Sequence, residues 1–189
     1  MRIFTLIIGL LFTLPSLANW QLVNDKSQFN FVTTKKNSAT EVHQFTQLKG
    51  AISPKGKVNL TIDLSSVETN IPIRNERMQK FLFETNLFPK ASFTTSIDNQ
   101  VIEKLNVGEV ARIEIAGEIA LHGAKKTVTT QVQVIKLGNN NIMVNSLKPI
   151  IIQANDFNLV AGVEKLKALA VLPSISNAVP ISFSLYFTQ

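Results

Sequence analysis

Residues 69–93, TNIPIRNERMQKFLFETNLFPKASF, interrupt a chain that otherwise has the pattern of successive β-strands. Three apolar side chains in this stretch, Met78, Phe81 and Leu82, follow the i, i+3, i+4 spacing of a short helix with one apolar face. A helix of this kind between strands is suited to cover the open end of a hollow structure. Two interpretations stay open: the helix is a lid on a cavity, or it packs over an ordinary filled core.

The limits of this helix follow from its capping residues. Asn75 is of a type that favours the N-cap position, so we expect the helix to run from about Glu76 to Phe83. Pro89 cannot continue a helix, and the pattern predicts that a strand begins near Ser92.

The first eighteen residues, MRIFTLIIGLLFTLPSLA, predict a secretory signal peptide. A basic start and a short apolar run precede Ser16-Leu17-Ala18, which has small residues at both positions of a cleavage site. The run is too short for a membrane-spanning helix. We therefore expect cleavage after Ala18 and a periplasmic mature chain, residues 19–189, that forms one domain. The chain has no cysteine, so neither a disulfide nor a lipid-modified cysteine is expected.

The rest of the chain alternates apolar and polar residues with the period of two that is typical of β-strands. Short turns separate the strands and no βα unit repeats, which favours an all-β antiparallel meander of about eight strands. A closed lipocalin-like barrel fits this count, with a two-sheet sandwich as the alternative. A second short helix is expected around residues 163–170, ended by Pro173. The expected strands are 29–33, 41–52, 58–64, 93–97, 101–105, 111–119, 128–137, 142–153 (bent at Pro149) and 179–187.

The composition argues against several functions. The net charge is +6, but the basic residues are scattered, whereas nucleic-acid-binding proteins gather them with aromatic side chains. A solvated surface with some attraction to anionic lipid head groups explains them, so no nucleic-acid partner is expected. The 12 Phe residues, against one Trp and one Tyr, suit walls that stay dry.

No pattern of catalytic or metal-binding residues is present. His43 and His122 stand apart from one another and from paired carboxylates, so a metal site is not predicted. The carboxylates Asp63, Glu76 and Glu84 have ordinary surface spacing, and no nucleophile motif or glycine-rich phosphate loop occurs. We therefore predict that the protein is not an enzyme and requires no cofactor. Eight-stranded barrels can be filled with side chains or can hold one small ligand, and composition does not decide between these.

Several short motifs occur in a fixed order along residues 20–189: Asp63, Arg74-Asn75, Phe88-Pro89-x-x-x-Phe93, Gly117-x-x-x-Leu121-His122-Gly123 and Asn155-Asp156-Phe157. Together they resemble the YceI-like family of exported, lipocalin-like proteins. Asn75 stands where the family usually has Asp, and Asn158 where a Gly often follows Asp-Phe.

The resemblance implies an extended eight-stranded barrel with an elongated apolar cavity. It also implies binding of a long isoprenoid or another long-chain amphiphile, such as a polyprenyl quinone or a fatty amide. The cavity is expected to be gated by the helix at 76–83 and lined by Phe29, Phe31, Phe45, Ile62, Met78, Phe81, Leu82, Phe93, Ile113, Ile115 and Phe183.

Two further interpretations stay open. One is a structural or stress-response protein with a filled core and a protein partner. The other is an accessory of electron transfer that hands a quinone to a membrane enzyme, with transient contact with the membrane surface.

Overall fold

The strands form a closed antiparallel barrel in the computed structural model, which describes residues 19–36 and 38–189. The predicted signal peptide lies outside these residues and stays a prediction. Closure occurs because β1 pairs with β4 on one side and with β12 on the other. The strands are β1 Trp20–Leu22, β2 Gln28–Lys35, β3 Ala39–Phe45, β4 Leu48–Ile52, β5 Lys57–Asp63, β6 Val67–Glu68, β7 Lys90–Ser96, β8 Val110–Leu121, β9 Ala124–Gly138, β10 Asn141–Ser146, β11 Ile150–Gln153 and β12 Ala178–Thr188.

Several of these strands are successive parts of one interrupted strand. Along one edge of β12, residues 187–188 pair with β1 and residues 181–184 pair with β2. Along its other edge, β10 and β11 follow one another in the same way, and β3 with β4 and β5 with β6 repeat the arrangement. In the described residues the barrel therefore has eight strands around its circumference, which confirms the predicted barrel; the sandwich alternative is wrong.

The β8–β9 hairpin has the turn chemistry that its sequence predicts. His122 and Gly123 both have positive φ, 49° and 75°, which is the geometry of a tight two-residue hairpin turn that matches the twist of its strands. The side chain of His122 is held by Glu84, with Nε2 and Oε2 2.8 Å apart, and its ring lies 4.4 Å from that of Phe88. His122 is thus part of the turn.

Side-chain packing inside the barrel requires a glycine at position 117. It lies on the inward face of β8, and a Cβ atom there would come 2.3 Å from the ring of Phe93 on β7. Because Gly117 leaves the backbone of β8 bare at this point, the ring of Phe93 can lie against it.

Three expected strands are wrong: two of them are each divided into two strands, and the third is largely a helix. The expected strand 41–52 is two strands, β3 and β4, because residues 46 and 47 leave the sheet; its Val42 points outward and is 64% exposed. Residues 101–105 do not form a strand: they largely fall in the helix α2, Gln100–Glu103, where Ile102 is buried. The strand 142–153 divides into β10 and β11 on either side of Pro149, because proline cannot donate a ladder hydrogen bond.

The first helix begins earlier than its sequence predicts. α1 is Pro72–Arg77, with Ile71 at the N-cap and proline at the first helical position. Asn75 therefore lies inside the helix, and its side chain holds the preceding segment: Oδ1 accepts from the amide and hydroxyl of Thr69, and Nδ2 donates to Glu68. An Asp could accept but not donate, and it would repel Glu68, so Asn suits this position.

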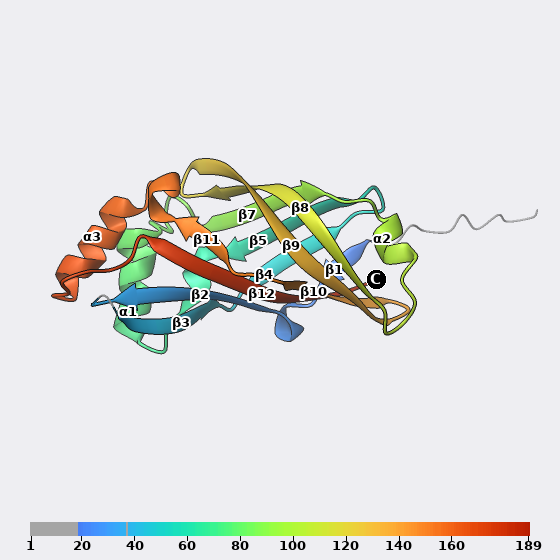
Figure 1. Cartoon of the computed structure of the whole chain (residues 1–189). Helices are drawn as coiled ribbons and strands as arrows, with labels where there is room; N and C mark the ends of the chain where they lie inside the picture. The colour runs from blue at the N-terminus through green and yellow to red at the C-terminus, as the bar shows by residue number, and fades with distance from the viewer. Residues whose placement is uncertain (1–18, 37) are drawn as a thin grey trace, which may run out of the picture.

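Helical segments cover the two ends of the barrel (Figure 1). α1 and α3, Val160–Leu169, lie at one end and α2 lies at the other. α3 matches the predicted second helix, although it ends before Pro173. It packs closely on the π-helical turn η3, Met78–Leu82, because Gly162 has no Cβ to meet the backbone of Phe81 and Leu82.

Short 3-10 turns complete the chain. Asn158, which follows the last of them, adopts a left-handed conformation with φ 56°, and Asn tolerates this conformation better than most residues. None of the helices in the described part of the chain is both long and apolar enough to cross a membrane. The turns are η1 Asn24–Lys26, η2 Leu64–Ser66 and η4 Ala154–Phe157.

Candidate ligand cavity

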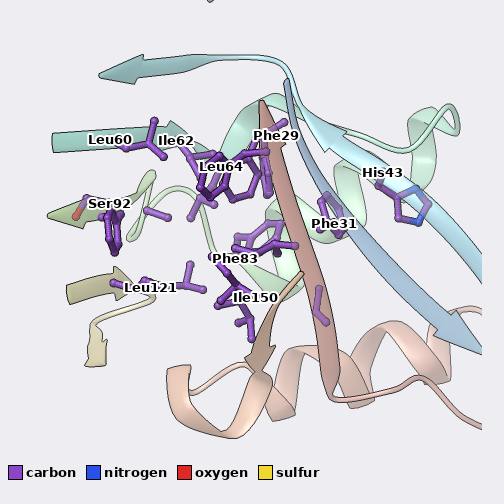
Figure 2. Close-up of a pocket in the computed structure, with 18 of the residues that line it drawn as sticks. Phe29, Phe31, His43, Leu60, Ile62, Leu64, Phe83, Ser92, Leu121 and Ile150 are labelled. Atoms are coloured by element: carbon purple, nitrogen blue, oxygen red, sulfur yellow. The ribbon is translucent and has the colours of Figure 1, made fainter. Parts of the chain in front are cut away.

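An apolar cavity of about 490 Å³ runs through the barrel. Its volume lies within the usual range of ligand pockets, roughly 300–1,000 Å³. The wall extends from Ile102 in α2 to Leu166 in α3, so it includes residues from both ends of the barrel. Figure 2 shows Phe29, Leu64 and Phe83 gathered together in this wall, with His43 to one side. The sequence left open whether the barrel is filled, and the structure shows it hollow.

The structure brings together ten of the eleven residues that the sequence proposed for this site. They come from β2, β3, β5, η3, β7, β8 and β12, whose inward positions converge because side chains alternate along a strand. Contact with a ligand stays a prediction for all ten. They are Phe29, Phe31, Phe45, Ile62, Met78, Leu82, Phe93, Ile113, Ile115 and Phe183.

Phe81 is the exception, and its predicted place in the wall is wrong. In an ordinary α-helix Phe81 would share a face with Met78 and Leu82, but η3 is a π-turn in which the amide of Phe83 bonds the carbonyl of Met78 at 2.9 Å. The wider turn directs Phe83 inward and Phe81 outward. Phe81 instead lies beneath the ammonium groups of Lys80 and Lys165, which are 5.2 and 5.6 Å from its ring centre.

The cavity wall also contains residues that were not among the eleven proposed from the sequence. The alternation in 179–187 already marked one apolar face of β12, and that whole face lines the cavity. Phe83 is also in the wall and 7% exposed, but only the π-turn places it there. No sequence signal identified the polar residues of the wall, because they are far apart in the chain.

Three cations gather where α1 meets the ends of β2 and β3. Lys35, Arg74 and Arg77 all line the cavity, and we call them the cationic rim. Two exposed apolar residues of the wall, Ile71 and Ile73, lie beside Arg74 in sequence and are 43% and 52% exposed. This end of the cavity is therefore polar and partly open to solvent.

Glu41 joins two members of the rim from outside the cavity. Its Oε2 is 2.6 Å from the ammonium of Lys35 and also accepts a hydrogen bond from the guanidinium of Arg74. The hydrogen bond from Lys35 is the largest cause that lowers the pKa of Glu41, from 4.5 to about 2. Burial is the next largest and opposes it, and the hydrogen bond and charge of Arg74 lower the pKa further. The carboxylate thus stays ionised at neutral pH.

His43 lies in the wall next to the rim. Its ring is 4% exposed and lies 5.2 Å from that of Phe31, and its Nε2 is 3.0 Å from the hydroxyl of Thr33. Burial, with the nearby charge of Arg74, lowers the pKa of His43 below its usual value. His43 is therefore neutral at physiological pH.

Among the described residues, no group of three or more His, Cys, Asp or Glu side chains could hold a metal ion. The wall is mainly apolar, and its charged side chains among the described residues, Lys35, Arg74 and Arg77, lie at one end.

The fold and its interior define a class, the closed antiparallel β-barrels that enclose an apolar cavity. Within that class, the chain belongs to the YceI-like family: the model described as "YceI-like domain" matches residues 20–187. The comparison confirms the resemblance that the short motifs carry.

Solved structures show the same architecture. A polyisoprenoid-binding domain from Saccharophagus degradans, implicated in plant cell wall breakdown, is 39% identical, with a TM-score of 0.89 over 92% of this chain and 99% of that one. BcnA from Burkholderia cenocepacia is 20% identical, with a TM-score of 0.67 over 87% and 98% of the two chains. A YCEI protein from Campylobacter jejuni is 14% identical, with a TM-score of 0.53 over 100% and 99%. The last two similarities bear on the fold alone. No curated protein matches the chain.

Proposed function

We propose that this protein binds a long-chain isoprenoid or another lipid-like amphiphile, of the polyprenyl quinone or fatty amide type, in the barrel cavity, for storage or transport in the periplasm. The observation that carries the proposal is the apolar cavity that runs through the barrel. The likeness to a polyisoprenoid-binding domain supports the isoprenoid class. The signal-peptide pattern supports the location.

The length of the cavity matters energetically. A ligand that buries about ten CH₂ groups gains on the order of 8 kcal/mol gross, at ~0.8 kcal/mol each. Association takes back at least ~4 kcal/mol, so a shallow depression would bind weakly. A wall that continues from α2 to α3 offers contacts along an extended chain. A filled-core structural protein would have no use for such a space.

The first test uses protein recovered from its native periplasm. Native mass spectrometry should show adducts in the mass range of long-chain lipids, and extraction should identify them. Intact mass should correspond to a chain that starts at Asn19. A mass that retains residues 1–18 would contradict the periplasmic proposal.

The second test blocks the cavity. Ile115 points inward on β8 and the exposed Ala116 next to it points outward, so the pair is a matched comparison. In delipidated protein, Ile115→Trp should weaken binding of a polyprenyl quinone at least about tenfold by removing space for the chain, whereas Ala116→Trp should leave it unchanged. Equal affinities for both variants, with both folded, would contradict binding inside the barrel.

A further inference from the structure

We propose that two copies of this chain associate side by side, by forming an antiparallel strand pair along the edge of β8 that faces β7. The pair is arranged around a twofold axis, so the same edge is used in both copies. The association does not depend on the identity of any ligand in the cavity.

β7 and β8 pair over only part of their length. Their ladder joins residues 92–94 to residues 118–120. Beyond the ladder the hydroxyl of Thr95 donates to the carbonyl of Ala116 at 2.6 Å, and β7 ends one residue later. No other strand of the described chain pairs with β8 on this side, so residues 110–115 are left with an edge that we call the free edge.

The backbone groups at the free edge point towards a missing neighbour. In an antiparallel ladder, successive residues direct their N–H and C=O groups to opposite sides. The amide of Lys136 on β9 donates to the carbonyl of Glu109 at 3.0 Å, so odd-numbered residues of this segment face β9. The carbonyl of Ala116 accepts from β7, so even-numbered residues face the other way. The backbone groups of Arg112 and Glu114 therefore lie at the free edge.

The charges on β8 favour pairing with another copy. Proteins usually protect an exposed edge with charged side chains, especially lysine, and charges of one sign repel a second copy. β8 instead carries Arg112 and Glu114, which have opposite signs, are both exposed and stand two positions apart on the outer face. Neither forms an ion pair within the described chain, whereas Glu118 further along the strand pairs with Lys125 at 2.9 Å.

One register makes these charges self-complementary. When Ile113 lies opposite Ile113 of the partner subunit, Arg112 of each copy lies opposite Glu114 of the other. Residues 112 and 114 are then the hydrogen-bonded pairs, as the direction of their backbone groups requires. A shift of two residues would place Arg112 opposite Arg112, or Glu114 opposite Glu114, and like charges directly opposite one another destabilise a sheet.

The free edge also leaves part of the cavity wall uncovered. Ile113 and Ile115 line the cavity, yet they are only half-buried, and a second strand against this edge would cover them further. A lipid surface fits the free edge less well, because hydrocarbon cannot satisfy unpaired backbone groups. Arg112 and Glu114 together also carry no net charge to attract anionic head groups.

Charge reversal tests the register. A single strand pair is a small interface, so we expect a weak dimer, measured by sedimentation equilibrium at low salt over about 1–500 µM. Arg112→Glu and Glu114→Arg should each weaken the association at least about tenfold, because each places like charges opposite one another. The double variant, in which the two charges are exchanged, should recover the wild-type dissociation constant within about threefold. An equimolar mixture of the two single variants should form a heterodimer for the same reason.

A disulfide locates the twofold axis even if a charge variant fails to fold. The chain has no cysteine, so a single substitution is unambiguous. In a non-hydrogen-bonded pair the two Cα atoms lie about 4.5 Å apart, which a disulfide can span, so Ile113→Cys should cross-link under mild oxidation. Ala111→Cys is the matched control on the same face of β8. Its two copies would lie four positions apart along the strands, roughly 14 Å, and should not cross-link.

The outcomes judge the dimer separately from the binding function. A folded wild-type protein that stays monomeric at every concentration would overturn the inference. Association that neither single variant weakens, or that the double variant does not restore, would place the interface elsewhere. Equal cross-linking of the two cysteine variants would show that the register is wrong. In each case, binding of a polyprenyl quinone to the same samples reports on the proposed function independently.

Discussion

The two ends of the barrel differ in how closely their side chains are packed and in how far they are exposed to solvent. At the end covered by α2, Trp20 and Ile142 are 5% and 0% exposed and do not line the cavity, so side chains there pack against one another. At the end covered by α1 and α3 (Figure 1), Ile71 and Ile73 of the cavity wall are 43% and 52% exposed, and the cationic rim lies beside them. The α2 end is closed by packed side chains, whereas the α1–α3 end is partly open to solvent.

This difference shows why a hollow barrel can be stable without a disulfide. The packed end supplies a dense core in which Lys136 is held over the ring of Trp20, 4.8 Å from its centre. α2 is tied to the β4–β5 turn because the side chain of Asn99 donates to the carbonyls of Ser53 and Pro54. The open end can then keep a cavity and unbalanced charge that a small core could not tolerate by itself.

The largest effect is expected at the packed end. Ile142→Ala should lower the free energy of unfolding by about 2–5 kcal/mol, because it removes contacts and leaves a void where nothing can relax into it. A denaturant titration measures this, with the outward Val42→Ala as the near-neutral control. Ligand affinity of the folded variant should stay within about twofold. A loss below ~1 kcal/mol would mean that this end is not packed as described.

An intermediate effect is expected where α3 meets η3. A Cβ atom at Gly162 would lie 2.6 Å from the carbonyl oxygen of Phe81, so Gly162→Ala should push the two segments apart and cost about 1–3 kcal/mol. We also expect faster ligand dissociation, measured by stopped-flow displacement, since the cover of the α1–α3 end is loosened. Gly138→Ala, whose nearest neighbour would be a side-chain amide at 3.4 Å, is the control. Unchanged dissociation would show that ligands leave elsewhere.

The smallest effect is expected at the rim and depends on pH. The pKa of Glu41 is about 2 in the folded protein against 4.5 without its partners, so its contribution is present above pH 4.5 and is lost as pH falls towards 2. The full displacement would correspond to about 3 kcal/mol, but the side chain is 40% exposed, so screening reduces the expected value to about 1 kcal/mol.

The measurement compares wild type with Glu41→Gln between pH 6 and pH 2. The variant should be less stable by about 1 kcal/mol at pH 6, and the two curves should converge as pH falls. Glu68 and Glu109, whose pKa values are also lowered, are common to both proteins and cancel in the difference. A difference that is constant with pH would mean that the ion pairs with Lys35 and Arg74 contribute nothing.

Local patterns in the sequence determined much of this protein. Alternation along strands such as 58–64 and 179–187 identified the inward faces, because a strand directs every second side chain to the same side whatever its neighbours are. The turn at His122-Gly123 needed only the chemistry of adjacent residues. The short motifs identified the family, and eight of the ten proposed residues that line the cavity lie on strands.

Tertiary structure decided the remaining features of the site, because those features depend on contacts between distant segments. The π-turn of η3, which turns Phe81 outward and Phe83 inward, has no signal in the spacing of apolar residues. Whether the barrel is hollow depends on how closely its walls approach. The cationic rim brings Lys35 together with Arg74 and Arg77, which are far from it in the sequence. The sequence pattern gives no reason to place these three residues together, because each is of a type that usually lies on the solvated surface. Only the fold shows that all three line the same cavity.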